Sequence, residues 1–361
     1  MPEPNEVVFS CRTLTPIWTG DIDRDSAQVK ESGILGSLRF WYEGLLRLHG
    51  VRVCGALGQD EKCDCDVCDL FGKTGQARKF RLTVDGLDPK HLFFQAHKDV
   101  VATHGAYLYS VFTGEKMSAY VPKMSFELDC LWAAKGPFNL QFGFRAGVDG
   151  QRCKTLLTLL LHELSTKGGI GAKTQLGFGQ IEVLPPEDGD LQELLDYARL
   201  EMEQMQQQRP ATNAPSATEG FTLHPDRFFS VVFEGILPPE YIPSPRNEID
   251  IGLPAKIPGR PFVPCAFDIR YSRKPYIDPD INAGLRPRFK ADFPGSALDM
   301  LGYVRDGEGF GSRVHVSHLY KQNLSEEKYR LKIWGDVSDP QNVRKTVVDL
   351  VNKVLRMKPV S

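Results

Sequence analysis

The sequence predicts an α+β protein in which antiparallel sheets carry helices on one face. Two observations favour this class: apolar helical segments alternate with short strand-like runs in the first half, and the second half closes with a strand and a helix. Between the halves, residues 209–220 are rich in proline, alanine and threonine, as linkers are. We therefore expect an N-terminal domain at 1–184, a polar helix and linker at 185–220, and a C-terminal domain at 221–361.

The first half begins with a strand and an amphipathic helix. Residues 6–14 alternate as a strand does, and the proline and glycine of 15–20 end it. Residues 34–48 place apolar side chains at helical spacing, between a Ser-Gly pair and a His-Gly pair. This helix should cover one face of a sheet.

Further strands, a second helix and a last strand complete the first half. The strand-like runs lie at 78–84, 91–96, 123–130 and 138–144, the helix at 153–164 and the last strand at 180–184. The order strand, helix, strands, helix, strand is that of a split βαβ fold of the ferredoxin type, with the extra strands as insertions.

The second half indicates a distant repeat of the same fold. A glutamine-rich helix at 190–208 precedes the linker. Beyond it we expect strands at 228–233, 315–319 and 328–334 and a helix at 339–356. A basic segment at 286–298 and a second glycine-rich loop at 307–313 lie between these elements, and we expect that loop to repeat an arrangement of the first half.

Composition limits the class of function. The chain has 361 residues, a formal net charge of −2, and no apolar run that approaches the roughly 18 residues of a membrane span. Its start lacks the basic and apolar regions of a signal peptide, so we expect a cytoplasmic protein without a membrane partner. Binding to nucleic acid would have to come from local basic patches, since the net charge is slightly negative.

Five glycines fall within the twelve residues 168–179, which we call the glycine-rich loop. Main-chain N–H groups at Gly169 and Gly171, with the ammonium of Lys173, suit a phosphate. No Gly-Lys-Ser/Thr closes the loop and a strand follows it, so a nucleoside-triphosphate site is not indicated. The alternative is a connection whose glycines only ease a tight turn.

The start of the first helix is a second place for an anion. Free N–H groups there are joined by Ser37 and by Arg39. In a split βαβ fold the glycine-rich loop reaches the same side of the sheet, so the two elements should converge. Alternatively, Gly36 only lets the helix pack tightly, and Arg39 is simply solvated.

The basic segment of the second half interleaves cations with an aromatic ring. Arg286, Arg288 and Lys290 flank Phe289, and Arg313 follows the second glycine-rich loop. Guanidinium groups bind phosphates while a ring stacks on a base, so we expect RNA contacts here. The alternative is a solvated loop anchored by its phenylalanines.

Four of the eight cysteines lie close together: Cys54, Cys63, Cys65 and Cys68. Four thiolates suffice for a closed tetrahedral zinc site, which orders a loop and leaves no open position for catalysis. His49 could replace Cys54 as the fourth ligand. The alternative is a flexible loop with free cysteines.

No histidine stands in a convincing catalytic setting, and structural roles are favoured. A metal-independent endoribonuclease would need a histidine beside the glycine-rich loop, for which His49 and His162 are the nearest candidates.

Several motifs resemble one family. Thr-Pro-Ile-Trp-Thr-Gly at 15–20, Gly-Ser-Leu-Arg-Phe-Trp at 36–41, the cysteine turn at 65–72, the glycine-rich loop and Ile-Gly-Leu-Pro at 251–254 are similar to the repeat-associated mysterious proteins (RAMP superfamily) of CRISPR effector complexes. Within them, the chain resembles the subunit-one family of type III-B Cmr complexes.

The resemblance implies two ferredoxin-like domains of the RNA-recognition type. It implies a non-catalytic RNA-binding subunit in antiviral defense, with crRNA, target RNA and other Cmr subunits as partners and contacts near the crRNA 3′ end. Target cleavage belongs to other subunits, and a CRISPR-processing endoribonuclease of the same superfamily is the alternative. Leu35 stands where relatives often have an arginine, which leaves Ser37, Arg39 and Lys173 to contact phosphate.

Overall fold

The computed structural model describes residues 6–20, 26–54, 63, 65–95, 104, 107, 111, 127–185, 190–210, 223–237, 266–271, 284–305, 308–323 and 325–360. The N-terminal unit is built on a four-stranded antiparallel sheet with the strand order β2-β5-β1-β6. Its strands are β1 (Glu6–Thr13), β2 (Phe80–Asp85), β5 (Pro137–Phe144) and β6 (Ile181–Val183).

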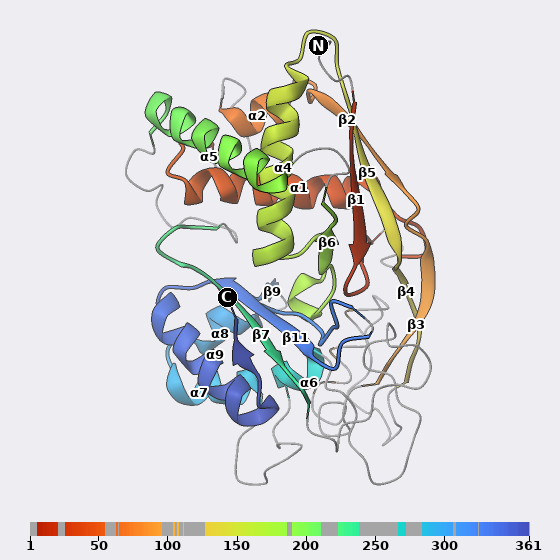
Figure 1. Ribbon diagram of the computed structural model, residues 1–361. Coiled ribbons are helices and arrows are strands. Elements are labelled where there is room, and N and C mark those ends of the chain that lie inside the picture. Colours follow the sequence, from red (N-terminus) through yellow and green to blue (C-terminus); the bar gives the residue numbers. More distant parts are fainter. Residues whose placement is uncertain are drawn as a thin grey trace.

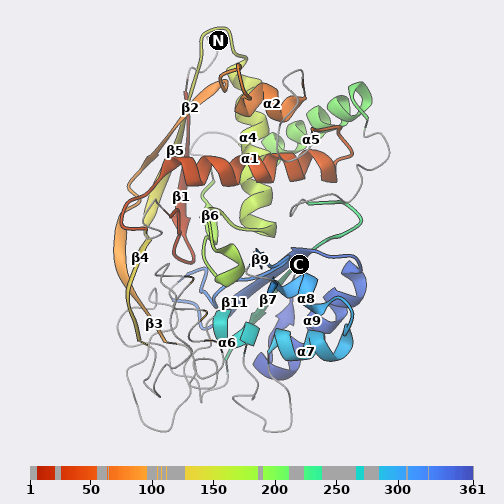
Figure 2. The same cartoon turned by 180° about the vertical axis from the view of Figure 1, so that it is seen from behind.

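Two long helices, α1 (Glu31–Leu48) and α4 (Gly150–Lys167), cover one face of this sheet and cross each other (Figure 1 and, from behind, Figure 2). The sheet face that meets them is apolar at every second residue of β5, where Phe138, Leu140 and Phe142 are buried. The connection strand, helix, two strands, helix, strand confirms the ferredoxin-type prediction.

Three further elements are additions to this plan. A separate two-stranded ribbon, β3 (Pro89–Gln95) with β4 (Glu127–Ala134), is inserted between β2 and β5. The short helix α2 (Asp66–Phe71) follows α1, and the long helix α5 (Leu191–Gln208) packs on α4 through the buried residues Leu195, Ala198, Met202 and Met205.

The C-terminal unit repeats the strand order of the first. Its sheet runs β10-β11-β7-β12, which places its strands, counted along the chain, in the same 2-3-1-4 order as those of the N-terminal sheet. The strands are β7 (Phe228–Gly235), β10 (Val314–Val316), β11 (Tyr329–Asp336) and β12 (Lys358–Pro359). The helices on it are α6 (Ala266–Tyr271), α7 (Leu285–Asp292), α8 (Ala297–Leu301) and α9 (Pro340–Leu355). This confirms the prediction of two copies of one fold.

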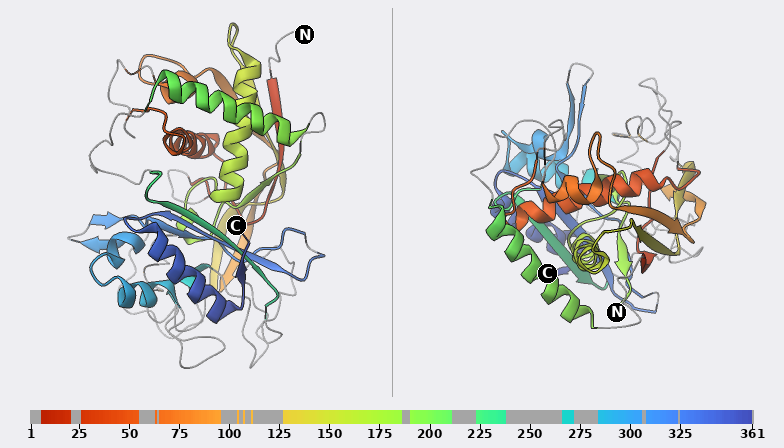
Figure 3. Two further views of the ribbon diagram at one scale, coloured as in Figure 1. Left: turned by 60° about the vertical axis from the view of Figure 1, so that its left-hand side comes forward. Right: turned by 90° about the horizontal axis from the view of Figure 1, so that it is seen from above.

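The C-terminal sheet lies between its own helices and the N-terminal unit (Figure 3, left). Val231 and Phe233 of β7 point into the core shared with those helices. Alternate residues of β11 point the other way: the Trp334 ring lies 5.1 Å from that of Trp41 on α1, and Lys332 Nζ donates to the Gly168 carbonyl at 3.1 Å. The two units are thus packed together through one face of this sheet.

Two expectations for the C-terminal unit are wrong. The basic segment is not the solvated loop that was the alternative to an RNA contact, because its described part forms α7 and α8. Three residues of the second glycine-rich stretch form β9 (Glu308–Phe310), which pairs with β8 (Tyr303–Arg305) and precedes β10. The position equivalent to the first glycine-rich loop, between α9 and β12, is only two residues long. Hence the C-terminal unit does not repeat that loop.

Candidate functional site

The glycine-rich loop connects α4 to β6 and is mostly buried. Its middle forms a short 3-10 turn, η1 (Thr174–Leu176). A Cβ atom at any of its five glycines would come within 3 Å of another protein atom. The neighbours are the Trp41 ring at Gly168, Gln180 at Gly169, the Trp18 carbonyl at Gly171, Ala266 and His318 at Gly177, and the Ile170 carbonyl at Gly179. The close approaches that need glycine therefore occur inside the protein.

Gly169 and Gly171, both expected to contact RNA, are engaged by the N-terminal unit. The buried Gly169 accepts a hydrogen bond from Trp41 Nε1 at 2.9 Å. Gly171 has a φ of +83°, and the N–H of the next residue, Ala172, donates to the Trp18 carbonyl at 2.7 Å. Gly169 thus has no solvent-facing surface to offer, whereas Gly171 is half-buried and Ala172 is exposed.

Lys173 stands at the rim of the loop. Its Nζ donates to the Val111 carbonyl at 2.6 Å and lies 3.9 Å from the centroid of the Trp18 ring. A carbonyl and an aromatic face hold an ammonium group without neutralising its charge. The half-buried Lys173 therefore places its ammonium group beside the loop.

The first turn of α1 adjoins the loop through residues 17–19. Trp18 forms a bridge with Ala172 on one side, and a Cβ atom at Gly33 of α1 would lie 2.9 Å from the Thr19 carbonyl on the other. Gly36 is exposed, and a Cβ atom there would meet nothing within 4 Å. Tight packing therefore does not explain Gly36, and the surface above it is open to a ligand.

The two side chains expected at this helix start differ in their surroundings. Ser37 is half-buried next to Gly36. Arg39 points to α2, where its guanidinium donates to the Gly72 carbonyl at 2.6 Å and to Cys68 Sγ at 3.9 Å. The structure therefore assigns Arg39 to the surroundings of the cysteine cluster, and not to the side of the loop.

The basic residues of the C-terminal unit do not surround an exposed aromatic ring, as the sequence predicted. Phe289 is 0% exposed in the core, so the prediction that its ring stacks on a base is wrong. Around it on α7, Arg286 donates to the Gly302 carbonyl at 3.2 Å, Arg288 pairs with Asp292 and Lys290 is exposed.

Arg313 lies 3.7 Å from the buried Asp336. The positive charge of its guanidinium is thus partly balanced, and Arg313 is half-buried beside the hairpin of β8 and β9.

Arg286 also lies near Tyr107. Burial is the dominant effect on that phenol and raises its pKa to about 12, while the charge of Arg286 acts in the opposite direction and lowers the pKa.

The histidines that touch the glycine-rich loop are not the ones expected. His315 Nδ1 lies 2.8 Å from Thr174 Oγ1, and the N–H of His318 donates to the Gly177 carbonyl at 3.3 Å. Burial lowers the pKa of both imidazoles to about 3, so they stay neutral at physiological pH.

His49 and His162 lie elsewhere. His49 follows α1 and lines a cavity of about 880 Å³ between the two units, and His162 lies in the middle of α4. Sequence reasoning missed His315 and His318 because they come from the other unit, more than 130 residues away from the loop in the chain. No local sequence signal marks them.

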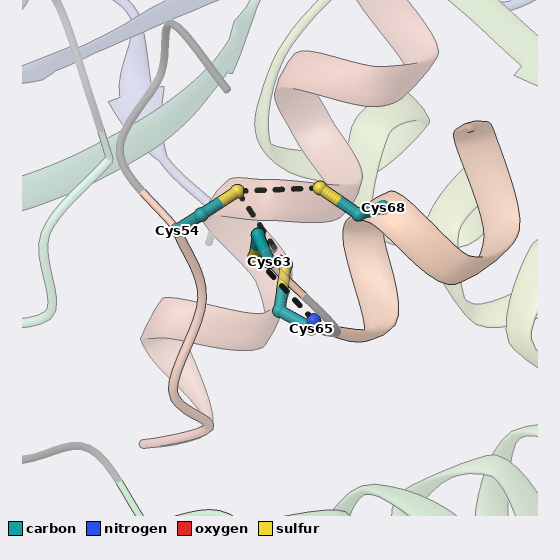
Figure 4. Close-up of side chains that lie close together, drawn as sticks. All are labelled: Cys54, Cys63, Cys65 and Cys68. Carbon is teal, nitrogen blue, oxygen red and sulfur yellow. Dashed lines mark hydrogen bonds between the residues drawn. The ribbon is translucent and has the colours of Figure 1, made fainter. Parts of the chain in front are cut away.

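The four cysteines form one cluster (Figure 4). The Sγ atoms of Cys54, Cys63, Cys65 and Cys68 all lie within 4.8 Å of one another, and Cys54 is 3.5 Å from both Cys65 and Cys68. Tetrahedral zinc with bonds of about 2.3 Å separates its sulfur ligands by about 3.8 Å. The donor set fits a zinc ion, and it is completed by Cys54, with His49 outside the cluster.

Electrostatics around the cluster suit an anionic sulfur shell. The hydrogen bond between their thiols lowers the pKa of Cys65 to about 4 and raises that of Cys54. Arg39 donates to Cys68, and Arg47 Nη2 donates to the Cys54 carbonyl at 2.9 Å. Arg47 is also paired with Glu43 at 2.7 Å, so Arg39 is the cation that would partly balance the charge of a four-thiolate site.

Among the described segments, no helix combines the length and the apolar character needed to cross a membrane.

The comparison with protein-family models gives a match in the N-terminal unit. The family model described as "RAMP superfamily" matches residues 10–182. No curated protein matches the sequence.

Among solved structures, Cmr1 from Pyrococcus furiosus has a TM-score of 0.47 at 13% identity, with 98% of each chain covered. A chain of the type III-B Cmr-beta complex bound to cognate target RNA and AMPPnP has a TM-score of 0.49 at 13% identity, covering 96% of this chain and 99% of that one. Cmr6 from Pyrococcus furiosus has a TM-score of 0.27 at 14% identity and covers 50% of this chain and 98% of its own.

The matched residues run from within β1 to within β6 and include α1, α4 and the glycine-rich loop, so the N-terminal unit is similar to the RAMP superfamily.

Proposed function

We propose that this protein is a non-catalytic, RNA-binding subunit of a type III-B CRISPR (Cmr) effector complex that contacts crRNA and target RNA near the crRNA 3′ end in the cytoplasm. The observation that carries the proposal is the RAMP match, which spans the N-terminal fold from β1 to β6. The motifs at 15–20, 36–41 and 251–254 support the narrower assignment by resemblance. The partners would be the RNAs and the other Cmr subunits.

The N-terminal contact would be the surface shared by α1 and the loop rim. It consists of the open Gly36, the hydroxyl of Ser37, the exposed Ala172 and the ammonium of Lys173, with Gly171 beneath them. Backbone dipoles at a helix start and a nearby cation both favour a phosphate. We propose a phosphate of the RNA backbone as the ligand, bound without regard to base identity.

The C-terminal contact would be electrostatic. Residues 221–361 carry 21 Lys and Arg against 17 Asp and Glu, whereas residues 1–220 carry 23 against 29. The positive excess thus lies in the C-terminal unit, where Arg286, Arg288, Lys290 and Arg313 are at least partly exposed. We propose that these cations hold phosphates, and that the domains divide at 1–184, 185–220 and 221–361.

The cysteine cluster would hold a structural Zn²⁺ ion. A four-thiolate site leaves no open position, so its chemistry is to hold the segment after α1 against α2. Arg39, at 3.9 Å from Cys68 Sγ, would support this site from outside the ligand shell.

A pair of variants tests the N-terminal contact. Gly36→Ala adds a methyl group where nothing lies within 4 Å, so we expect it to stabilise the isolated chain by about 1 kcal/mol. The same methyl group should weaken RNA retention by the assembled complex, because it occupies the surface where the phosphate would approach. Unchanged RNA retention in a more stable Gly36→Ala protein would remove this surface from the proposal.

Lys173→Ala should lower RNA affinity equally for all sequences and reduce the salt dependence by about one unit of slope. Lys328→Ala, which removes an exposed lysine paired with Glu234, is the matched control. Labelled repeat RNA, incubated with the protein without metal, should stay intact. Specific cleavage that His49→Ala or His162→Ala abolishes would instead establish the endoribonuclease.

A further inference from the structure

The edge of the N-terminal sheet at β1 is only partly covered by β6, which lies beside one part of β1 (Figure 1). β6 pairs with residues 11–13, and the N–H of Leu184 donates to the Ser10 carbonyl at 2.8 Å. Alternate residues of an antiparallel strand direct their N–H and C=O groups to the same side, so Val8 is the next residue that offers both groups to this edge. In the described part of the chain, no residue pairs with Val8 there.

The sequence stops β6 from covering the rest of β1. Pro185 and Pro186 follow Leu184 directly. Proline has no N–H group, so the chain cannot go on donating hydrogen bonds along β1 beyond Ser10. Among the described residues, the pairing along β1 accordingly ends at Ser10.

A cavity of about 390 Å³ lies along this free edge. β1 from Glu6 to Ser10 forms one wall, and the end of β6 and the start of α5 form the other, with Leu184, Leu191 and Leu194. Val8, like Glu6, alternates with the buried Val7, so its side chain, which is 49% exposed, lies on the sheet face turned away from α4, and Val8 offers its main chain to the groove. Leu184 is 38% exposed. The cavity is thus bounded on both sides by described elements.

The floor of the groove carries the ammonium group of Lys154. Lys154, Thr158 and His162 lie one helical turn apart along α4 and all line the cavity. Among the described residues, no carboxylate forms an ion pair with Lys154. Glu6 also lines the cavity, but it alternates with the buried Val7 and so points to the other face of β1 from α4.

We propose that this groove binds an extended, acidic segment of a neighbouring protein subunit, which adds to β1 as a further strand and directs a carboxylate at Lys154. Main-chain groups at Val8 would give the segment its hydrogen bonds, and Lys154 would select its charge. The identity of the neighbour, another subunit of the same effector complex, rests on the proposed function. The chemistry of the segment rests on the groove alone.

Hydrogen exchange tests the added strand in the protein as it exists. The complex, purified through a tag on another subunit, is compared with the isolated chain at residues 6–10. We expect exchange in the complex to be slower by about tenfold or more, because the Val8 amide gains a ladder hydrogen bond. Equal exchange in both samples overturns the proposal, and so does protection already present in the isolated chain.

Digestion with a nuclease distinguishes a protein segment in the groove from RNA, which is the alternative occupant. If the protection disappears when RNA is digested while the subunits stay together, RNA lies in the groove and the proposal is wrong. If the tagged complex lacks this chain altogether, the proposed function fails, and the assignment of the neighbour fails with it.

Two matched pairs of variants test the chemistry. Val8→Pro removes the N–H at the free edge but spares the pairing of β1 with β5, while Val8→Ala keeps the N–H. Lys154→Glu reverses the charge of the floor, while Lys154→Gln only removes it. We expect Val8→Pro and Lys154→Glu to lower incorporation into the complex about tenfold or more, with melting temperatures near that of the parent protein. Normal incorporation of both variants overturns the proposal, whatever the behaviour of the controls.

Discussion

Lys332 of β11 should make the stability of the protein depend on pH in a defined direction. Its ammonium group is 1% exposed and donates to the carbonyls of Ser165 and Gly168, at the end of α4. Helix carbonyls at a C-terminus favour a cation, but burial disfavours it more, and the pKa falls from 10.5 to about 7. The replacement Lys332→Met keeps much of the side-chain volume and removes the titration.

The direction in which the free energy of unfolding changes with pH follows from the number of protons bound in each state. Between pH 7 and 10.5 the unfolded chain keeps the lysine proton while the folded chain has lost it, so the free energy of unfolding rises with pH. The full difference in pKa corresponds to about 5 kcal/mol, at no more than about 1.4 kcal/mol per pH unit. Below pH 7 both states are protonated, and the contribution of Lys332 is constant.

The assay is urea unfolding of the parent protein and of Lys332→Met at steps from pH 6 to 9.5, followed by tryptophan fluorescence, since the rings of Trp334 and Trp41 are in contact at the same interface. The quantity of interest is the difference between the two free energies of unfolding, in which the titration of cysteines and other groups cancels. We expect this difference to be flat below pH 7 and to shift by about 3 kcal/mol in favour of the parent by pH 9.5. A difference that stays flat throughout would show that the carbonyls hold Lys332 charged, and would refute the reasoning.

Three other changes have defined outcomes. Cys65→Ser should abolish binding of about one zinc ion per chain, measured by metal analysis, and lower the melting temperature by roughly 5–10 °C, whereas a purified protein without zinc contradicts the metal site. Gly168→Ala should destabilise the fold by about 1–3 kcal/mol in urea, because the added methyl group overlaps the Trp41 ring, and a neutral result would mean that α4 can shift at its end. Phe289→Ala should cost about 3–5 kcal/mol of unfolding free energy from the lost core packing alone, and a surface-like effect below about 0.5 kcal/mol would return Phe289 to the RNA surface.

Sequence periodicity sufficed for the fold of the N-terminal unit because its signals are local. The alternation of β5 and the helical spacing of α1 and α4 each lie within one element, and the order of elements then selects the ferredoxin-type plan. The helix α7 was missed for an equally local reason: Pro287 and three basic residues make 286–290 read as a loop, while the buried Leu285 and Phe289 supply only two apolar positions, one turn apart.

The cysteine cluster could also be predicted, since three of its ligands fall within six residues. The environment of the glycine-rich loop could not. Its glycines meet Trp41, Trp18 and His318, which are distant in the chain, so nothing in the twelve residues distinguishes close packing from an open ligand site. The position of Arg39 could not be predicted either. Its guanidinium contacts the sulfur of Cys68, and a change of one helical turn would be enough to direct it to a phosphate instead.

The glycine-rich loop joins the two units, and this gives its glycines a physical reason without a ligand. Lys332 holds the carbonyl of Gly168, His315 meets Thr174 and His318 meets Gly177, so the C-terminal sheet contacts the loop along its length. A side chain at Gly177 would meet Ala266 and His318 and push the two units apart, whereas the other four glycines make room for residues of the N-terminal unit. Any phosphate contact at the exposed rim, around Ala172 and Lys173, would then depend on the C-terminal unit as well, because that unit fixes the conformation of the loop from behind. In an RNA-binding subunit, substitutions at His315 or Lys332 should therefore weaken the rim contact without touching RNA.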